Sequence, residues 1–386
     1  MVQLSVQEWT DRKRNLFSKH VRLGLANIGG LYHHKPPTLS DAMLLLDAAI
    51  KCGITRFDTA PLYGYRMSEQ MFGRARLMPA LAEALGHDRI DVSTKVLRSI
   101  TLRHRSLDTT QPAFWKLDEP YNSAVEVWGV TNHDIGTQLF DSLASMNLPS
   151  VTGVALHDVY DAIHETKNSQ HPISYDDMGP VVRFLKSQIE LGRVREIGFA
   201  DKFDEPIVEL SSRFPKRTFG YCEATTFTLA SHHEAIEKTL PLCLDHNMPY
   251  RVAGPFFSRI LSRDPRKAKK VEGRNGQVAY YYDPDTRLDV VTWNYHNITD
   301  GEFERACVIW DLAQAYGEES PRAAAVQFCL AHPAVQELVI GASGPERLAS
   351  LEEDINHPVP GAYFDALRDE GILHPEAPVP PVLASV

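Results

Sequence analysis

Short apolar runs alternate along this chain with longer segments in which apolar residues recur at helical spacing. The short runs are rich in Val, Ile and Phe and lack a clean polar–apolar alternation, which is typical of parallel strands covered by helices. Eight such runs occur, and they read VRLGLA, ITRFD, IDVSTK, VTGVALH, VREIGFA, FGYCEA, PYRVAG and ELVIG. Eight strand–helix units in 386 residues predict an α/β protein with a (β/α)8 TIM barrel.

The segments between these runs predict helices. LSDAMLLLDAAIKCG opens with Ser40 as a predicted cap and stops at Gly53, and MGPVVRFLKSQIELG and HHEAIEKTLPLCLDH have similar periodicity. A doubly wound dinucleotide-binding sheet usually carries GxGxxG after its first strand, and LGLANIGG has the wrong spacing for it. We therefore expect one domain over residues 1–386, with a barrel core at about 20–357 and an extension at each end.

Two polar segments interrupt the alternation, at about residues 98–133 and 258–300. They follow the third and seventh predicted strands, so these long loops should lie at the C-terminal face of the barrel, where barrel active sites are built. Whether they form a lid is left open. The basic stretch RDPRKAKK in the second loop is expected to be a solvated surface rather than an anion site.

Composition narrows the possible partners and the compartment. The formal net charge of −10 disfavours nucleic acid and anionic membrane surfaces. No apolar run reaches the length of a membrane span and the N-terminal stretch has no signal-peptide core, so we expect a cytosolic protein.

The five cysteines form no CxxC pair and are expected to be reduced and buried. No Cys/His spacing suggests a metal, and the pairs His33–His34 and His232–His233 are expected at the surface. The oligomeric state is not predicted.

Four ionisable residues stand at or just after the predicted ends of three successive strands. Asp58 ends the second strand in FDTAPLYG and Tyr63 lies in the turn behind it, Lys95 ends the third strand, and His157 ends the fourth. Each residue alone has an ordinary structural explanation, such as a turn former, a surface charge or a satisfied core histidine. Because strand ends converge at a barrel mouth, their joint occurrence predicts a catalytic cluster.

The chemistry of such a cluster is specific. A lysine ammonium near a phenol favours the phenolate and lowers its pKa from about 10, and an aspartate keeps the buried lysine charged. A neutral histidine beside the tyrosine can donate to a substrate oxygen. This set suits proton transfer in carbonyl–alcohol interconversion, in which a cofactor carries the hydride.

The stretch GITRFDTAPLYGYRMSEQMFG resembles the signature of the aldo-keto reductases, and the resemblance extends from about Leu23 to Asn356. It implies a (β/α)8 barrel, a catalytic tetrad of Asp58, Tyr63, Lys95 and His157, and a nicotinamide dinucleotide across the barrel mouth. TFTLASHH, AGPFFSRIL and AAAVQFCLAHPAV are similar to the aldose 1-dehydrogenase branch, which includes D-threo-aldose (L-fucose), L-galactose and D-arabinose dehydrogenases.

The resemblance also implies a set of cofactor-binding positions, some of which depart from the family pattern. Many reductases of the family bind the 2′-phosphate of NADPH with a Lys-Ser-x-x-x-Arg motif after the last strand. In GASGPER, Gly341 and Ala342 replace the Lys and Ser, and Arg347 is retained. The loss of the lysine charge favours NAD slightly over NADP. Ala200 and Asp201 stand where Ser-Asn usually holds the nicotinamide amide. The full predicted cofactor set is Ala26, Ala200, Asp201, Gly254, Pro255, Phe256, Phe257, Ser258, Leu261, Gly341, Ala342, Ser343 and Arg347.

Three functions are compatible with these residues. The first is an aldose 1-dehydrogenase that oxidises C1 of a cyclic sugar to a lactone. The second is an NADPH-dependent reductase of a hydrophobic aldehyde or ketone, with Trp115, Trp128 and Trp293 of the long loops lining its pocket; Trp128 and Trp293 are the candidate substrate contacts. The third is a non-catalytic, cofactor-binding regulatory protein, for which the complete tetrad would be a costly buried charge cluster. Substrate and reaction direction are not fixed by the sequence.

Overall fold

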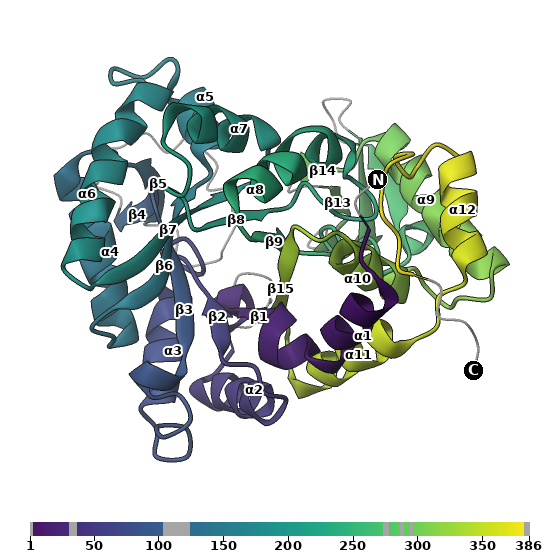
Figure 1. The fold of residues 1–386 in the computed structure, drawn as a ribbon, viewed down its shortest axis with the longest axis horizontal. Coiled ribbons are helices and arrows are strands. Elements are labelled where there is room, and N and C mark those ends of the chain that lie inside the picture. Colours follow the sequence, from purple (N-terminus) through teal and green to yellow (C-terminus); the bar gives the residue numbers. More distant parts are fainter. Residues whose placement is uncertain are drawn as a thin grey trace.

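The computed structural model describes residues 3–30, 37–102, 124–272, 278–285, 289–293 and 296–381. Eight parallel strands close into a barrel in the order β1, β15, β9, β8, β7, β6, β3, β2 (Figure 1). Their bounds are β1 Val21–Gly24, β2 Arg56–Asp58, β3 Asp91–Val96, β6 Val151–His157, β7 Val194–Asp201, β8 Tyr221–Ala224, β9 Tyr250–Ala253 and β15 Val335–Gly341. Each of the eight predicted runs overlaps one of these strands, so the predicted barrel is confirmed.

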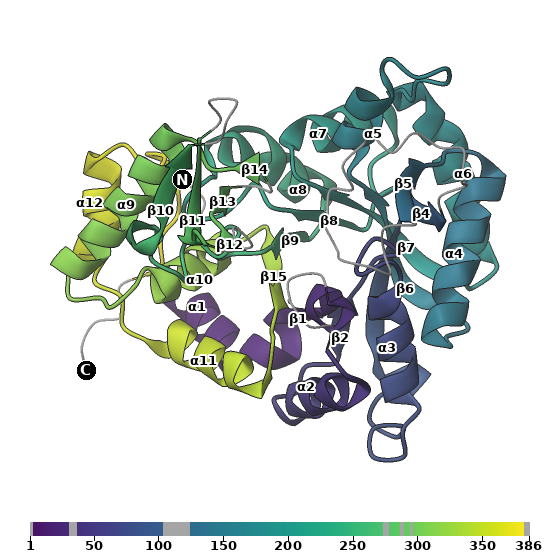
Figure 2. The same cartoon turned by 180° about the vertical axis from the view of Figure 1, so that it is seen from behind.

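Helices between successive strands surround the barrel (Figures 1 and 2). The helices that alternate with the strands are α2 Leu39–Lys51, α3 Met67–Arg76, α4 Asn132–Met146, α6 Met178–Glu190, α7 Asp204–Arg213, α8 Leu240–His246, α10 Arg322–Ala331 and α11 Pro345–Asn356. Outside this alternation, the described residues also form the α-helices α1 Val6–Arg14, α5 Val159–Thr166, α9 Asp300–Ala315 and α12 Gly361–Asp369. Helices α9 and α12 pack side by side at one edge of the molecule.

The N-terminal extension packs on the barrel. Arg12 of α1 is buried, and its Nη1 donates to the carbonyl oxygens of Leu330 at 2.8 Å and Val335 at 2.6 Å. This extension also contacts the C-terminal segment, because Gln3 Nε2 donates to the carbonyl oxygen of Val379 at 3.3 Å. These contacts support a single domain, which stays a prediction.

The start of α2 differs from the prediction. The helix begins at Leu39, and Thr38 rather than Ser40 is its N-cap, in a reciprocal capping box with Asp41. The predicted cap was wrong because Thr38 has the acidic residue three positions later that the box requires, whereas Ser40 lies within the first turn. The predicted stop is confirmed, since Gly53 follows the helix with φ +88°.

Charged side chains fill the N-terminal end of the barrel interior, which the sequence did not predict. Fully buried Arg22 of β1 pairs with Asp91 at 2.9 Å and with Glu337 at 2.8 Å. Arg251 of β9 pairs with Glu196 at 3.0 Å and with Glu337 at 3.3 Å. The guanidinium carbon of Arg251 also lies over the ring of Tyr221, 3.6 Å from the ring centroid.

That ring requires glycine on the neighbouring strands. A Cβ on Gly153 of β6 would lie 2.8 Å from the Tyr221 hydroxyl, and a Cβ on Gly198 of β7 would overlap the ring itself. The glycines in VTGVALH and VREIGFA are therefore explained by the close approach of a large side chain from β8.

Both long loops contain antiparallel strands. The loop after β3 carries β4 Arg98–Leu102 paired with β5 Ala124–Trp128. The loop after β9 carries β10 Lys269–Glu272, β11 Val278–Asp283 and β12 Asp289–Val290 in one sheet, and β13 Thr292–Trp293 with β14 His296–Asn297 in another (Figure 2). The basic residues of RDPRKAKK are exposed, as predicted.

Several predictions on cysteine and histidine burial are corrected. Cys222, Cys243 and Cys329 are buried free thiols, but Cys52, the C-cap of α2, and Cys307 of α9 are only partly buried. His232 is buried rather than exposed, since its ring bonds the carbonyl oxygen of Thr228 at 2.9 Å and accepts from the backbone of His374 at 3.1 Å. His33–His34 and Trp115 lie outside the described residues.

Within the described part of the chain, no helix has both the length and the apolar character needed to cross a membrane. The same residues contain no group of three or more His, Cys, Asp and Glu side chains that could hold a metal ion.

Candidate active site

The four predicted catalytic residues meet at the carboxyl ends of adjacent strands. Asp58 is the last residue of β2, Lys95 lies one residue before the end of β3, and His157 ends β6. These three strands are neighbours in the barrel, with Asp58 opposite Ser93 and Lys95 opposite Ala155 in the register. Tyr63 follows β2 in a turn held by Gly64, where a Cβ would overlap the carbonyl oxygen of Gly29.

Lys95 and Asp58 form a buried ion pair. The ammonium contacts Asp58 Oδ2 directly and donates to the carbonyl oxygen of Thr59 at 3.1 Å, and the side chains are only 1% and 2% exposed. Ser93 Oγ donates to the second carboxylate oxygen of Asp58 at 2.7 Å. Burial alone would lower the pKa of Lys95, but the charges of Asp58 and Glu223 raise it well above its ordinary value, so the lysine stays cationic.

Tyr63 lies between this cation and His157. Lys95 Nζ is 4.9 Å from the centroid of the Tyr63 ring, and the Tyr63 and His157 rings meet edge to face at 6.3 Å. Tyr63 is partly exposed whereas Asp58, Lys95 and His157 are buried, so the tyrosine is the member of the cluster that solvent reaches.

His157 is held in its neutral form. Burial lowers the pKa of His157 to about 3, although Asp158, whose Oδ2 is 3.7 Å from Nε2, acts in the opposite direction. Its Nδ1 is buried with no hydrogen-bond partner among the described residues. A neutral imidazole with an unused nitrogen has the donor or acceptor capacity that a bound oxygen requires.

Two acidic residues near the cluster were missed by the sequence reading. Glu223 of β8 has Oε1 at 3.2 Å from Lys95 Nζ, and burial raises the pKa of its carboxyl group, as does Asp58. Glu69 of α3 is fully buried and accepts from Thr94 Oγ1 at 2.8 Å. A glutamate within the apolar run FGYCEA was the available signal for Glu223, because a buried carboxylate needs a partner.

The loop after β9 is tightly turned. Gly254 has φ +67°, and Phe257, Ser258 and Arg259 also have positive φ. Within the loop, the amide of Phe257 donates to Gly254 at 2.9 Å and that of Leu261 donates to Phe256 at 3.1 Å, so these two amides are already used. Phe257, Leu261 and Pro255 are buried, whereas Ser258 and Phe256 are partly exposed.

The cofactor positions predicted on β15 and β1 are adjacent, because Gly24 pairs with Gly341 and Ala26 follows in the next turn. Gly341, Ser343 and Arg347 are exposed and Ala342 is buried. Helix α11 begins at Pro345, with Gly344 as its N-cap. The exposed Glu346 folds its carboxylate over Gly344, where Oε1 would lie 2.8 Å from an added Cβ.

Asp201 is committed to backbone groups. Its carboxylate accepts from the amides of Lys202 at 2.8 Å, Phe203 at 3.1 Å and Tyr160 at 3.2 Å. Burial and the nearby Asp158 raise the pKa of Asp201 to about 8. Ala200 beside it is also buried, so the predicted contact with a nicotinamide amide stays a prediction.

The two candidate substrate tryptophans have packing partners. Trp128 Nε1 donates to Glu165 at 3.0 Å, and the Arg98 guanidinium lies over its ring at 5.2 Å. Trp293 is buried edge to face against Phe257 at 4.4 Å. Neither observation assigns a substrate contact.

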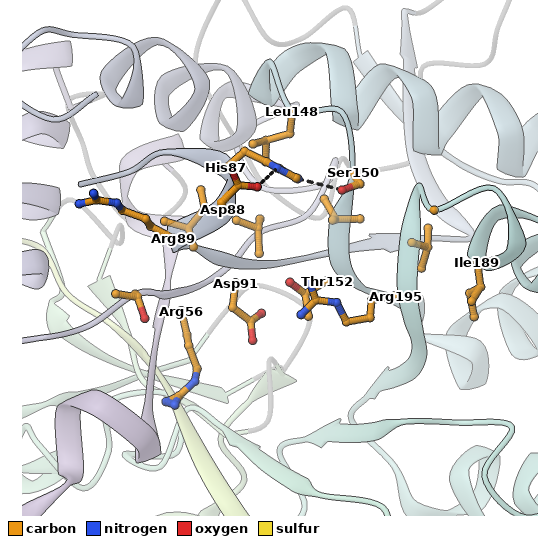
Figure 3. A pocket seen from close by; sticks show the side chains of 16 residues that line it. Arg56, His87, Asp88, Arg89, Asp91, Leu148, Ser150, Thr152, Ile189 and Arg195 are labelled. Atoms are coloured by element: carbon orange, nitrogen blue, oxygen red, sulfur yellow. Dashed lines mark hydrogen bonds and ion pairs between the residues drawn. The ribbon is translucent and has the colours of Figure 1, made fainter. Parts of the chain in front are cut away.

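A hollow of about 540 Å³ lies at the other end of the barrel (Figure 3). Its lining includes Asp91, Val151 and Val194, which are the first residues of β3, β6 and β7. His87 at its rim bonds Ser150 Oγ at 2.9 Å. Because it opens at the amino ends of the strands, it is separate from the cluster around Lys95.

Comparison with known proteins identifies the family. Residues 20–368 match the model of the aldo/keto reductase family. The chain is 26% identical over 370 residues to a pyridoxal 4-dehydrogenase of Microbacterium luteolum, covering 91% of this chain and 93% of that protein. It is 23% identical over 355 residues to a D-threo-aldose 1-dehydrogenase of a Pseudomonas species, with the same coverage.

Solved structures share the fold. A glycerol dehydrogenase of Gluconobacter oxydans superposes with a TM-score of 0.60 at 20% identity, covering 95% of this chain and 94% of that one. The holo form of an aldo-keto reductase of Bacillus halodurans gives 0.59 at 17% identity with the same coverage. With the family model matching nearly the whole length, the chain belongs to the aldo/keto reductases and is an NAD(P)-dependent oxidoreductase.

Proposed function

We propose that this protein is an aldose 1-dehydrogenase type of enzyme, which oxidises the cyclic hemiacetal of an aldehyde to a lactone. The observation that carries the proposal is the buried ion pair of Lys95 and Asp58 lying 4.9 Å from the ring of a partly exposed tyrosine. In this proposal Tyr63 exchanges the proton, Lys95 and Asp58 tune its acidity, and His157 holds the substrate oxygen.

The proton steps follow from the electrostatics. The cation of Lys95 stabilises the phenolate of Tyr63, which accepts the proton of the anomeric hydroxyl. In this proposal neutral His157, whose ring meets the Tyr63 ring edge to face, holds the same oxygen and so orients C1. A bound nicotinamide dinucleotide supplies the acceptor for the hydride that leaves C1. In the reverse direction Tyr63 protonates the carbonyl oxygen.

The residues at the mouth fit such a cofactor. A Cβ on Gly254 would meet no atom within 4 Å, so the end of β9 opens onto free space. Ser258 and the start of α11 could hold the phosphates, because a helix N-terminus favours an anion. The exposed Ser343 and Arg347 would lie with them.

We propose that NAD is preferred to NADP. Gly341 provides no cation for a 2′-phosphate, and the carboxylate of Glu346 lies over the N-cap of α11. A negative charge there offsets the attraction of the helix dipole for a second anionic group. Arg347 remains to contact the adenosine end of either cofactor.

The names of the two relatives support the substrate class. Aldoses and pyridoxal both carry an aldehyde and a hydroxyl group in one molecule and can close to a cyclic hemiacetal, whose oxidation gives a lactone. The alternative, a reductase of hydrophobic carbonyls, depended on the loop tryptophans. Trp128 and Trp293 have packing partners, which weakens that alternative.

A substrate panel tests the proposal. Purified protein is assayed by nicotinamide absorbance with L-fucose, L-galactose, D-arabinose, pyridoxal and a series of alkyl and aryl aldehydes, each with both cofactors in both directions. Oxidation of the hemiacetal compounds with NAD is expected. Activity confined to reduction of alkyl or aryl carbonyls with NADPH would support the alternative. Cofactor binding without turnover would support the regulatory protein.

A further inference from the structure

Lys95 contacts a second buried carboxylate besides Asp58. Glu223 Oε1 is 3.2 Å from Lys95 Nζ, and the side chains are 4% and 1% exposed. Glu223 is on β8, which is four positions from β2 in the eight-stranded order and therefore faces it across the barrel. Lys95 is thus held between carboxylates that reach it from opposite walls.

The two carboxylates differ in their hydrogen bonds. Asp58 accepts from Lys95 and from Ser93, so both its oxygens are satisfied. Glu223 contacts Lys95 through Oε1, and its Oε2 is buried with no hydrogen-bond partner among the described residues. Two buried carboxylates around one ammonium cannot both be ionised without cost, and Glu223, as the less satisfied one, is where a proton is held at lower pH.

Other charged groups also act on Glu223. Asp58 of β2 adds to the burial effect that raises the pKa of Glu223, while Lys95 of β3, Arg251 of β9 and Arg22 of β1 oppose it. Tyr221 lies on the same strand and its pKa is raised, chiefly by burial and partly by Glu223. Glu223 therefore responds to both the reaction cluster and the arginines beneath it.

We propose that Glu223 is a fifth member of the reaction cluster, a positioning residue that holds Lys95 from the wall opposite Asp58 and sets how much positive charge the Tyr63 phenol feels. This rests on the proposed role of Tyr63. When Glu223 is protonated, the lysine charge favours the phenolate. When Glu223 is ionised, its negative charge disfavours the phenolate and weakens the base.

Glu223→Gln tests this, because it removes the charge and keeps the shape. Tyrosinate absorbance is titrated in four proteins: the wild type, Tyr63→Phe, Glu223→Gln and the double variant Glu223→Gln/Tyr63→Phe. Subtracting the curve of each Tyr63→Phe protein from that of its parent with Tyr63 gives the titration of this one phenol among the 14 tyrosines. The titration of Tyr63 should fall by about one pH unit in the absence of Glu223. The alkaline rise of kcat/KM for oxidation should move down by the same amount. An unchanged titration would overturn the proposal.

Glu196→Gln is the matched control. Glu196 is another barrel carboxylate, but its ion pair is with Arg251 at 3.0 Å, so Tyr63 should titrate as in the wild type. If Glu223→Gln does not fold, Glu223→Asp withdraws the carboxylate by one methylene, and a smaller shift in the same direction is expected. A titration equal to that of the wild type would again overturn the proposal.

The titration needs no turnover, so its outcome is independent of the proposed aldose dehydrogenase activity. That activity is tested by Tyr63→Phe, and the proposed function fails if this variant stays active.

Discussion

The two ends of this barrel both contain buried charges, but they use different residues. At the N-terminal end Arg22, Arg56 and Arg251 pair with Asp91, Glu196 and Glu337. At the C-terminal end Lys95 pairs with Asp58 and Glu223 beside Tyr63 and His157. Arginine keeps its proton under all ordinary conditions, whereas lysine, tyrosine and histidine exchange theirs.

This difference separates structure from chemistry. At the N-terminal end three arginines match three carboxylates, so the charges balance and hold strands of the barrel together. At the mouth two carboxylates share one lysine, so these three buried groups carry one negative charge too many when all are ionised. An unbalanced buried charge costs stability, and active sites are where such costs recur.

The strongest test of the comparison is Tyr63→Phe. We expect turnover to fall by about 10³-fold, because a general acid–base group is removed, while cofactor affinity measured by fluorescence quenching is nearly unchanged. Tyr316→Phe is the matched control, since Tyr316 at the end of α9 is 38% exposed and should leave turnover as it is. A joint loss of turnover and cofactor binding in Tyr63→Phe would instead indicate a structural role.

At the other end, Arg22→Met should act on stability. It leaves Asp91 and Glu337 without their shared partner in a fully buried position, which should cost about 3–5 kcal/mol of unfolding free energy. Urea unfolding followed by circular dichroism measures the loss. The kcat of the folded fraction should stay at the wild-type value at low temperature. A fall in kcat without a fall in stability would contradict the division between the two ends.

The buried histidines sharpen the comparison through pH. The folded pKa of His157 is about 3 and its ordinary value is 6.5, so on acidification the unfolded chain takes up a proton before the folded one does. Stability from this group is complete above pH 6.5 and is lost as pH falls toward 3. Between pH 7 and pH 4, the unfolding free energy of His157→Gln should therefore fall by about 2–3 kcal/mol less than that of the wild type. Urea unfolding at each pH measures this difference.

His232→Gln is the comparison variant for this experiment. Burial also lowers the pKa of His232 to about 3, and its ring bonds Thr228 and His374 outside the cluster. The His232→Gln variant should also lose less unfolding free energy on acidification than the wild type, and its turnover should be unchanged. His157→Gln, in contrast, should lose turnover. Equal effects of the two variants on turnover would contradict the role proposed for His157.

The smallest expected effect concerns the cofactor. Glu346→Gln removes the exposed charge beside the N-terminus of α11 and should tighten NADP binding by about two- to fivefold. NAD affinity should not change, because that cofactor lacks the 2′-phosphate. Fluorescence titration with both cofactors at low salt measures the ratio. Glu352→Gln, on the same helix farther from the N-terminus, is the control.

Much of the fold was readable from local pattern. The eight apolar runs are strands because a strand buried on both faces must be apolar along its length, and this requirement is visible in a single stretch of sequence. The convergence of Asp58, Tyr63, Lys95 and His157 was also predictable, because in parallel strands the chain order fixes which ends share a face. The family resemblance supplied the same residues independently.

Contacts across the barrel were not readable in this way. Glu223 contacts Lys95 although the two residues are 128 positions apart in the sequence, and Arg22 contacts Glu337 although they are 315 positions apart. His232 is covered by a C-terminal segment that no local pattern places there. The sequence by itself determined the strands, their order and the end at which chemistry is expected, since these depend on neighbours along the chain. Only the tertiary structure decided which charges pair, because a side chain inside a barrel takes its partners from whichever wall lies within reach.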